Sequence, residues 1–409
     1  MRCHHCATEL EHVFLDLGFA PPSNSYLTET QLRQSEKAYP LKLLVCHECW
    51  LVQTQDNESG EALFHHDYPY FSSVSRTLVE HSRRYCEMIS KRLGLTEHSL
   101  VIEVASNDGY LLRNFVESGV PCLGIEPTAG TAAEAAKLGI PQVPEFFGEE
   151  TGRRLAAEGK TADLVIGNNV YAHVPDINDF TRGFKQVLKP DGTVTLEFPH
   201  LLSLMSYNQF DTVYHEHYSY LSLSTVSWIF AAAGLRVYDV EEIPTHGGSL
   251  RVYGCHYDSM LPSSERVAAT MAREKDAGLS EIATYLAFQP RVERIKDDFV
   301  AFLIDQKRAG KLVAGYGAAA KASTLLNYAG VKRDLLAFVS DAAPSKQGKF
   351  IPGCHIPVLG PDVLTQQEPD WVVIFPWNIA SEIMAGLSNV GHWGGRFVIA
   401  IPELQEQRA

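Results

Sequence analysis

The stretch Leu100-Val101-Ile102-Glu103-Val104-Ala105-Ser106-Asn107-Asp108-Gly109 decides the fold. Its first half is a short apolar run containing one carboxylate, which is typical of a strand buried in a parallel sheet. A polar turn that ends in glycine follows, and a helical pattern begins at Tyr110. The sequence therefore predicts a strand, a glycine turn and a helix, the unit from which doubly wound α/β sheets are built.

The same alternation continues downstream, so this unit is one of several. Further strands are predicted at Leu123–Glu126, Asp163–Gly167 and Thr193–Glu197, with helical patterns between them. Ligands of such sheets bind at the carboxyl ends of the strands. The residues that follow each strand are therefore the candidates for a binding site.

The turn after the first strand indicates which ligand binds there. It has one glycine in place of the Gly-x-Gly-x-x-Gly pattern, and Glu103 and Asp108 would repel a pyrophosphate. Glu126 ends the next strand, where a carboxylate can accept both hydroxyls of an adenosine ribose. Acidic groups suit the ammonium and sulfonium of S-adenosylmethionine (SAM), so the pattern favours SAM over NAD.

Two cysteine pairs mark the N-terminal part of the chain. Cys3-x-x-Cys6 and Cys46-x-x-Cys49 would complete a tetrahedral, structural Zn²⁺ site. Two unrelated redox pairs are the alternative, and His4, His5 or His47 could replace a cysteine ligand. Short strands are predicted at Phe14–Gly18 and Leu41–Val45, with so few apolar residues that zinc should do much of the folding.

A polar aromatic stretch, Tyr68–Ser75, leads into a helical pattern from Thr77 to Leu93 that Gly94 ends. The stretch either packs as a linker or closes over a ligand, and Tyr68 and Ser75 are its candidate substrate contacts. Further on, a helix at Ser224–Ala233 precedes strands at Arg236–Val240 and Leu250–Gly254. The turn between those strands offers His246 and Ser249, with Arg251 nearby, for a phosphate or sugar; a plain hairpin turn is the alternative.

Residues 311–409 repeat an α/β pattern, with strands at Leu312–Ala314, Leu335–Val339, Trp371–Phe375 and Arg396–Ala400. Gly315-x-Gly317-x-x-Ala320 followed by Asp341 matches a dinucleotide fingerprint and by itself suggests NAD. A glycine turn at a helix N-terminus holds any diphosphate, however. The candidate ligand contacts here are Gly317, Ala318, Lys321, Asp341 and Lys346, with Trp377 and Asn378 as further sugar or base readers.

The densest cluster of titratable groups is Val213-Tyr214-His215-Glu216-His217-Tyr218-Ser219-Tyr220. Apolar core segments do not have this composition, and such clusters gather where chemistry is done. A purely structural polar network is the alternative.

These features together resemble a known family. The Val101–Gly109 stretch looks like the first motif of class I SAM-dependent methyltransferases, and Asn168-Asn169-Val170-Tyr171-Ala172-His173-Val174-Pro175-Asp176 looks like the motif after their fourth strand. With the double CxxC before and Tyr-His-Glu-His after, the order resembles the sugar-nucleotide C-methyltransferases of antibiotic deoxysugar pathways. The resemblance covers essentially the whole chain and implies SAM, zinc and a TDP-linked ketodeoxysugar substrate.

The implied organisation has a zinc-binding domain at 1–65, a Rossmann-like SAM-binding domain at 66–258, a helical connector at 259–310 and a second Rossmann-like domain for the sugar nucleotide at 311–409. The implied SAM contacts are Glu103, Ser106, Asn107, Asp108, Gly109, Glu126, Asn168 and Asn169.

Methylation of carbon next to a ketone, with C-3 of the sugar as the first expectation, needs a base and a donor to the enolate oxygen. We expect His217 to be the base, Glu216 its partner or rival, and Tyr214 the donor, with His173 in support.

Composition narrows the alternatives. The chain has 409 residues, 45% hydrophobic and 21% charged, with no apolar run long enough for a membrane and no signal peptide at its start, which predicts a cytoplasmic protein. A net charge of −14 argues against a nucleic-acid partner such as the substrate of a zinc-ribbon RNA methyltransferase.

Methylation of oxygen or nitrogen and NAD-linked oxidation of a sugar nucleotide are the competing activities. Three domains around one cleft could work as a monomer.

Overall fold

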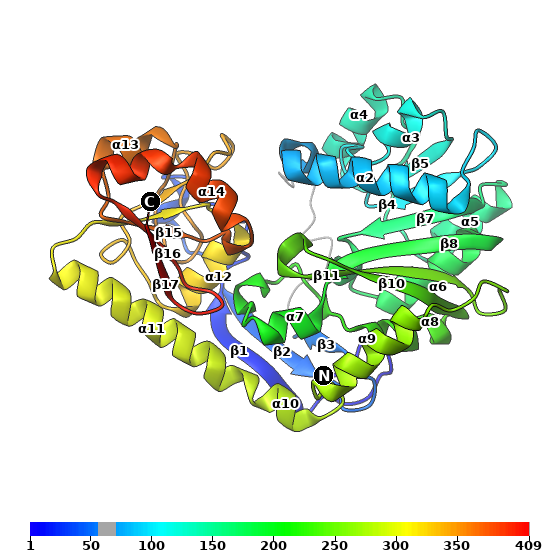
Figure 1. The fold of residues 1–409 in the computed structure, drawn as a ribbon, viewed down its shortest axis with the longest axis horizontal. Coiled ribbons are helices and arrows are strands. Elements are labelled where there is room, and N and C mark those ends of the chain that lie inside the picture. The colour runs from blue at the N-terminus through cyan, green and yellow to red at the C-terminus, as the bar shows by residue number, and fades with distance from the viewer. Residues whose placement is uncertain (56–70, 409) are drawn as a thin grey trace.

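The computed structural model describes residues 1–55 and 71–408. They form three β-sheets (Figure 1). The central sheet, on the right of the view, and the C-terminal sheet, on the left, stand on either side of the N-terminal sheet. No helix in the described ranges combines the length and the apolar character needed to span a bilayer.

The central sheet has seven strands in the order β10-β11-β8-β7-β4-β5-β6, and β11 alone runs antiparallel to its neighbours. The reversal of strand order lies between β4 and β7, where Glu103 pairs with Ile166. The strands are β4 (Val101–Val104), β5 (Cys122–Ile125), β6 (Gln142–Val143), β7 (Ala162–Asn168), β8 (Leu188–Pro199), β10 (Leu235–Ile243) and β11 (Ser249–His256).

Helices cover both faces of this sheet (Figure 1). They are α2 (Arg76–Leu93), α3 (Arg113–Glu117), α4 (Ala129–Lys137), α5 (Glu149–Ala157), α6 (Ile177–Val187) and α8 (Leu223–Ala232). The predicted helix at 77–93 is confirmed: the Ser75 hydroxyl caps α2 by accepting from the Leu78 amide, and Gly94 ends it with a φ of 65°. The helix predicted from Tyr110 begins later, at Arg113, because residues 110–112 form a turn.

The N-terminal sheet contains a strand from far along the chain. Its order is β1 (His12–Ala20), β2 (Tyr39–Val45), β3 (Val52–Thr54) and β9 (Ser219–Tyr220). β9 is the end of the titratable stretch recognised in the sequence, and Val52 of β3 pairs with Tyr220. The segment that follows the second cysteine pair therefore directly supports the candidate catalytic residues.

The C-terminal sheet has six strands in the order β14-β13-β12-β15-β16-β17, all parallel except β17. They are β12 (Val313–Tyr316), β13 (Val339–Ser340), β14 (Val358–Leu359), β15 (Trp371–Ile374), β16 (Arg396–Ile399) and β17 (Gln405–Arg408). The accompanying helices are α12 (Ala320–Tyr328), α13 (Asp362–Gln367) and α14 (Ala380–Gly386). The strand predicted at 335–339 is confined to Val339–Ser340, because the amides of Leu335 and Leu336 bond to the Lys332 carbonyl in a turn.

The predicted connector is helical, and it also joins the N-terminal and C-terminal sheets in one hydrophobic core. It comprises α9 (Glu265–Asp276), α10 (Ile282–Leu286) and α11 (Phe288–Arg308). The Phe288 ring of α11 stacks on Phe14 of β1 at 5.0 Å, and Val292 and Phe299 continue the same core toward the C-terminal sheet. The small N-terminal sheet therefore does not rely on zinc alone, because α10 and α11 supply the apolar surface that its own sequence lacks.

Candidate active site and metal centre

The four cysteines of the two CxxC pairs converge on one point. Their sulfurs lie within 4.8 Å of one another, with Cys3 Sγ 3.4 Å from Cys49 Sγ and Cys6 Sγ 3.5 Å from Cys46 Sγ. A tetrahedral Zn²⁺ with Zn–S bonds of about 2.3 Å would place its sulfurs about 3.8 Å apart. The cluster has close to the size that zinc requires.

The backbone around each pair is shaped for metal binding. The amide of Ala7 donates to the Cys3 carbonyl and the amide of Trp50 to the Cys46 carbonyl, each at 3.0 Å. Ala7 and Trp50 both adopt a positive φ, near 60°, which folds each CxxC into a tight turn. Four thiols with no fifth ligand position form a closed site, so the zinc is structural.

The carboxyl edge of the central sheet carries buried acceptor atoms that lack hydrogen-bond partners among the described residues. They are Glu103 Oε2, Asp108 Oδ1 and Asn168 Oδ1, at the ends of β4 and β7. Burial, together with the charges of Glu126 and Asp108, raises the pKa of Glu103 well above its usual value. Three unsatisfied acceptors fit the ammonium and sulfonium of SAM.

The other predicted SAM contacts have partners within the fold. Glu126 accepts from the backbone amides of Asn107 at 2.9 Å and Thr128 at 2.8 Å, which leaves its remaining lone pairs for the predicted ribose contact. The hydroxyl of Ser106 donates to Gln142. Gly109 adopts a φ of 79°, and a Cβ there would lie 2.5 Å from Ile140, so packing requires the glycine. Asn169 adopts a positive φ, and its amide donates to the Glu197 carbonyl at 2.7 Å.

A segment before α2 lies over the glycine turn. The amide of Ser72 donates to Asn107 Oδ1 at 2.9 Å, and that of Ser73 donates to Asp108 Oδ2 at 3.1 Å. Ser72 and Ser73 of the predicted aromatic stretch thus contact the glycine turn of the central sheet. Ser75 itself caps α2, and the predicted contact Tyr68 lies outside the described residues.

The base loop, Asp211–Tyr220, brings the predicted catalytic side chains together. The ring of His217 lies 4.0 Å from that of Tyr214 and 4.5 Å from that of His173, measured between centroids. The Tyr218 amide joins the two segments by donating to the Ala172 carbonyl at 2.7 Å. Three of the four predicted catalytic residues therefore share one place, although His173 is distant in sequence.

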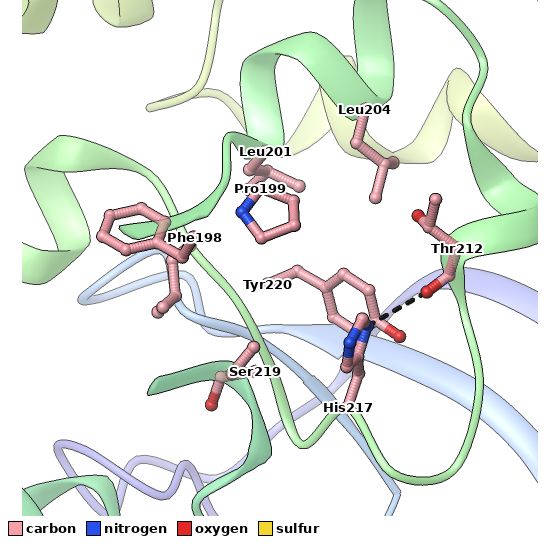
Figure 2. Close-up of a pocket in the computed structure, with 10 residues that line it drawn as sticks. Phe198, Pro199, Leu201, Leu204, Thr212, His217, Ser219 and Tyr220 are labelled. Atoms are coloured by element: carbon pink, nitrogen blue, oxygen red, sulfur yellow. Dashed lines mark hydrogen bonds between the residues drawn. The ribbon is translucent and has the colours of Figure 1, made fainter. Parts of the chain in front are cut away.

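Hydrogen bonds set the tautomer of both imidazoles. His217 Nδ1 lies 3.1 Å from the Thr212 carbonyl, as Figure 2 shows, and His173 Nδ1 lies 2.7 Å from the Glu216 carbonyl. A carbonyl only accepts, so each Nδ1 carries hydrogen and each Nε2 carries the lone pair. Burial lowers the pKa of His173 to about 4, and burial with the charges of His173 and His246 holds the pKa of His217 well below 6.5. Both rings are neutral bases at neutral pH.

Glu216 has a different environment from the one we expected. Its carboxylate accepts from Asn24 Nδ2 at 3.2 Å and from the Ser23 hydroxyl at 3.4 Å, both in the segment after β1. Burial raises its pKa. Because the Thr212 carbonyl holds the His217 tautomer, these contacts do not support Glu216 as the orienting partner of His217.

A small pocket adjoins His217 (Figure 2). Phe198, Pro199, Leu201 and Leu204 form its apolar wall, and His217, Ser219 and Tyr220 supply the polar groups. Leu201 and Leu204 belong to α7 (Leu201–Ser206), which follows β8 directly. An apolar wall of this kind limits the access of water to the His217 ring.

Lys321 and His246 approach the same region from two further elements. Lys321, in the first turn of α12, donates to Asn378 at 2.7 Å and lies 3.9 Å from the Trp377 ring centroid. Burial lowers the pKa of Lys321 to about 8 although Asp211 opposes the shift. His246, an exposed residue of the turn before β11, lies within reach of the Lys321 charge. The His246 charge in turn acts on His217. Lys321 and His246 therefore both belong to the electrostatic environment of the His217 region.

The side chains of Ser249 and Arg251 have partners within the fold. The Ser249 hydroxyl donates to the Thr245 carbonyl at 2.8 Å. The Arg251 guanidinium is buried and holds Glu197 at 2.7 Å and Glu241 at 3.1 Å. Glu197 also contacts His81 of α2 at 2.8 Å. Two carboxylates of the central sheet therefore match the charge of Arg251, and its predicted phosphate contact stays a prediction.

The glycine turn of the C-terminal sheet lies where its strand order reverses, between β12 and β15. Gly317 has a φ of 87°, and a Cβ there would lie 2.4 Å from Pro376, so only glycine fits. The Ala318 carbonyl accepts from Lys346 Nζ at 2.7 Å and from the Tyr26 hydroxyl. Asp341 accepts from the Ala343 amide and lies 3.9 Å from Lys346. The predicted residues therefore share one turn, and Tyr26 reaches it from the N-terminal part of the chain.

Sequence reasoning missed residues that act through tertiary contacts. Thr212 offers only a backbone carbonyl to His217, which no side-chain pattern reveals. Asn24 and Tyr26 reach the site from the segment between β1 and β2, and Asp211 lies just before the titratable stretch. Of these residues, only Asp211 had a signal in the sequence, namely its position close to the titratable stretch.

Family models match three consecutive parts of the chain. Residues 3–64 match a putative zinc binding domain, 78–240 a methyltransferase domain and 244–402 a C-methyltransferase C-terminal domain. These matches cover the cysteine cluster, the central sheet, and the C-terminal sheet except β17, with the helices leading to it.

Similar proteins agree with the models. The chain is 34% identical to the C-methyltransferase NovU of Streptomyces niveus over 401 residues, 98% of this chain and 95% of that protein. It is 27% identical over 99 residues, 24% of this chain and 36% of the other, to an uncharacterised methyltransferase of Mycobacterium leprae. A solved SAM-dependent methyltransferase from Clostridium acetobutylicum matches 44% of this chain and 92% of its own with a TM-score of 0.35 and 9% identity. The chain therefore belongs to the SAM-dependent C-methyltransferases that carry an N-terminal zinc-binding domain.

Proposed function

We propose that this C-methyltransferase methylates the carbon next to the ketone of a TDP-linked ketodeoxysugar, with C-3 as the first candidate, in deoxysugar biosynthesis for an antibiotic. The observation that carries the proposal is the neutral His217 imidazole, with its lone pair on Nε2 and its ring 4.0 Å from the phenol of Tyr214. Such a pair supplies the base and the oxyanion donor that carbon methylation requires.

The chemistry assigned to the chain begins with proton removal. His217 Nε2 takes the proton from the carbon next to the ketone, and the electron pair of that C–H bond moves to give an enolate. The Tyr214 hydroxyl donates a hydrogen bond to the enolate oxygen. SAM, when bound at the edge of the central sheet, supplies an electrophilic methyl group to the enolate carbon. His173 stays neutral, so it adds no positive charge beside His217 when His217 takes up the proton.

The nucleotide half of the substrate is assigned to the C-terminal sheet. Lys321 and the Gly317–Ala318 turn lie at its strand-order reversal, where open α/β sheets bind ligands. α12 has nine residues, and its N-terminus with Lys321 suits a diphosphate. The Lys321 charge reaches both Asp211 and His246, so this position lies next to the base loop.

The test is mass spectrometry of the product formed from SAM and a panel of TDP-3-keto- and TDP-4-keto-deoxysugars. We expect a mass gain of one methyl group with at least one ketosugar and none with the corresponding alcohol, because only the ketone acidifies its neighbouring carbon. Equal methylation of the alcohol would indicate oxygen methylation and contradict the proposal.

Binding of NAD is the control for the C-terminal turn. Protection of the fold by TDP but not by NAD is expected, measured as a rise in the melting temperature. Protection by NAD alone would instead favour an oxidoreductase role for this sheet.

A further inference from the structure

The beginning of the base loop is buried and held from two directions. Asp211, Thr212 and Val213 are all buried and lie in and just after η4 (Phe210–Thr212). On one side the Thr212 carbonyl accepts from His217 Nδ1. On the other side the next carbonyl, that of Val213, accepts from the hydroxyl of Thr324 at 2.7 Å. Two consecutive peptide groups thus connect the base to the C-terminal sheet.

Thr324 belongs to α12, the helix that starts at the proposed nucleotide turn. It lies one turn after Lys321, and its side chain is buried. A second contact reinforces the link, because Trp377 Nε1 donates to Asp211 Oδ2 at 2.8 Å. The elements at the strand-order reversal of the C-terminal sheet, α12 and the segment after β15, therefore both hold the segment that orients His217.

We propose that Thr324 is a positioning residue for His217. It fixes the Val213 carbonyl, and thereby the orientation of the preceding Thr212 carbonyl that keeps hydrogen on His217 Nδ1. Binding of the nucleotide at the start of α12 then stabilises the helix that holds the base. The inference rests on the proposed role of His217, and it adds that remote contacts to the nucleotide promote the chemical step as well as binding.

The expected consequence is a loss in kcat. Without the hydroxyl, the Val213 carbonyl is left buried without its partner and the segment shifts to find one. Misplacement of a reacting group by about 1 Å can cost about 100-fold in rate. We expect Thr324→Val, which keeps the shape of threonine, to lower kcat by about 10- to 100-fold while the KM for the sugar nucleotide changes much less.

Thr324→Ser is the matched control, because it retains the hydroxyl and should restore most of the activity. Thr324→Ala is the second variant, since it leaves room for water at the Val213 carbonyl if the valine variant does not fold. Melting temperature and SAM affinity of each variant show that the fold and the SAM site are intact.

A spectroscopic measurement separates positioning from general stability. In protein labelled with ¹⁵N-histidine, the resonances lost in His217→Asn identify His217. We expect the wild type and Thr324→Ser to show hydrogen on Nδ1, and Thr324→Val to show a mixture of tautomers. Wild-type kcat and an unchanged His217 tautomer in both the valine and alanine variants would overturn the inference.

Failure of the inference differs from failure of the proposed function. If His217→Asn is inactive while the Thr324 variants behave as wild type, only the positioning role is wrong. If His217→Asn transfers methyl at the wild-type rate, His217 is not the base and the proposed function itself fails.

Discussion

The pKa of His217 lies well below that of an ordinary imidazole. Burial, then the charges of His173 and His246, hold its pKa well below 6.5. A base acts only when deprotonated, so the acid limb of kcat/KM, which reports the free enzyme, should lie below pH 6.5. A profile of kcat/KM against pH tests this, and an acid limb at or above pH 6.5 would contradict the assignment.

The same shift predicts how stability changes with pH. The unfolded chain binds a proton on this histidine near pH 6.5, whereas the folded chain does not. The contribution of His217 to stability is therefore complete above pH 6.5 and is lost as the pH falls below it. His173, with its pKa lowered to about 4, acts in the same direction. The difference in melting temperature between wild type and His217→Asn, measured by thermal melts, should be smallest at acidic pH.

Asp108 is the residue on which charge recognition of SAM is most easily tested. Its Oδ2 accepts from the Ser73 amide, and its buried Oδ1 lacks a partner among the described residues. Asp108→Asn keeps an acceptor for Ser73 but removes the charge, so SAM should bind about 10- to 100-fold more weakly, the worth of one charge-assisted hydrogen bond. Isothermal titration checks this, with Asp258→Asn, an exposed aspartate, as control. Equal affinity in both variants would exclude Asp108 from the site.

At the scale of elements, Arg251 joins α2, β8 and β11 through Glu197. Removing the arginine would leave Glu197 buried without its main partner, which typically costs about 3–5 kcal/mol. Arg251→Met should therefore lower the free energy of unfolding by that order, with His81 partly compensating, and leave the KM for the sugar nucleotide nearly unchanged. Denaturant titration and kinetics together test it. If Arg251→Met is as stable as the wild type and has a raised KM for the sugar nucleotide, the result would support the predicted phosphate contact of Arg251.

The zinc centre and the base loop are joined by the pairing of β3 with β9. Chelation of zinc should loosen the turn that precedes β3 and then the pairing of Val52 with Tyr220. We expect hydrogen exchange at Tyr220 to rise on chelation, while the buried face of α11 stays protected. A Cys354→Ser variant, outside the cluster, should retain the metal and normal exchange. Unchanged exchange at Tyr220 in metal-free protein would show that the two are independent.

Elements that depend on short sequence patterns could be predicted, whereas features that depend on tertiary contacts could not. β4 with its glycine turn, α2 with its Gly94 end, and the cysteine cluster follow from patterns of a few residues. The pairing of β9 with β3 depends on a match between segments far apart in the chain. Likewise, the group that orients His217 is a backbone carbonyl, and the carboxylate partners of Arg251 come from other strands.

At the scale of the whole molecule, elements belonging to or next to all three sheets contact the base loop. The central sheet holds the SAM site, the N-terminal sheet supports Ser219 and Tyr220 through β3, and α12 beside the C-terminal sheet holds Val213. Under the proposed function, each sheet would therefore contribute one part of the reaction.

The central claim is that His217 removes a proton from carbon before methyl transfer. The measurement that tests it most directly is the exchange of the substrate's α-proton in D₂O, followed by mass spectrometry without SAM. The account predicts uptake of one deuterium with wild-type enzyme. With His217→Asn, both exchange and methyl transfer should fall by about 100- to 10,000-fold, while SAM still binds. Methyl transfer at the wild-type rate by His217→Asn would contradict the account.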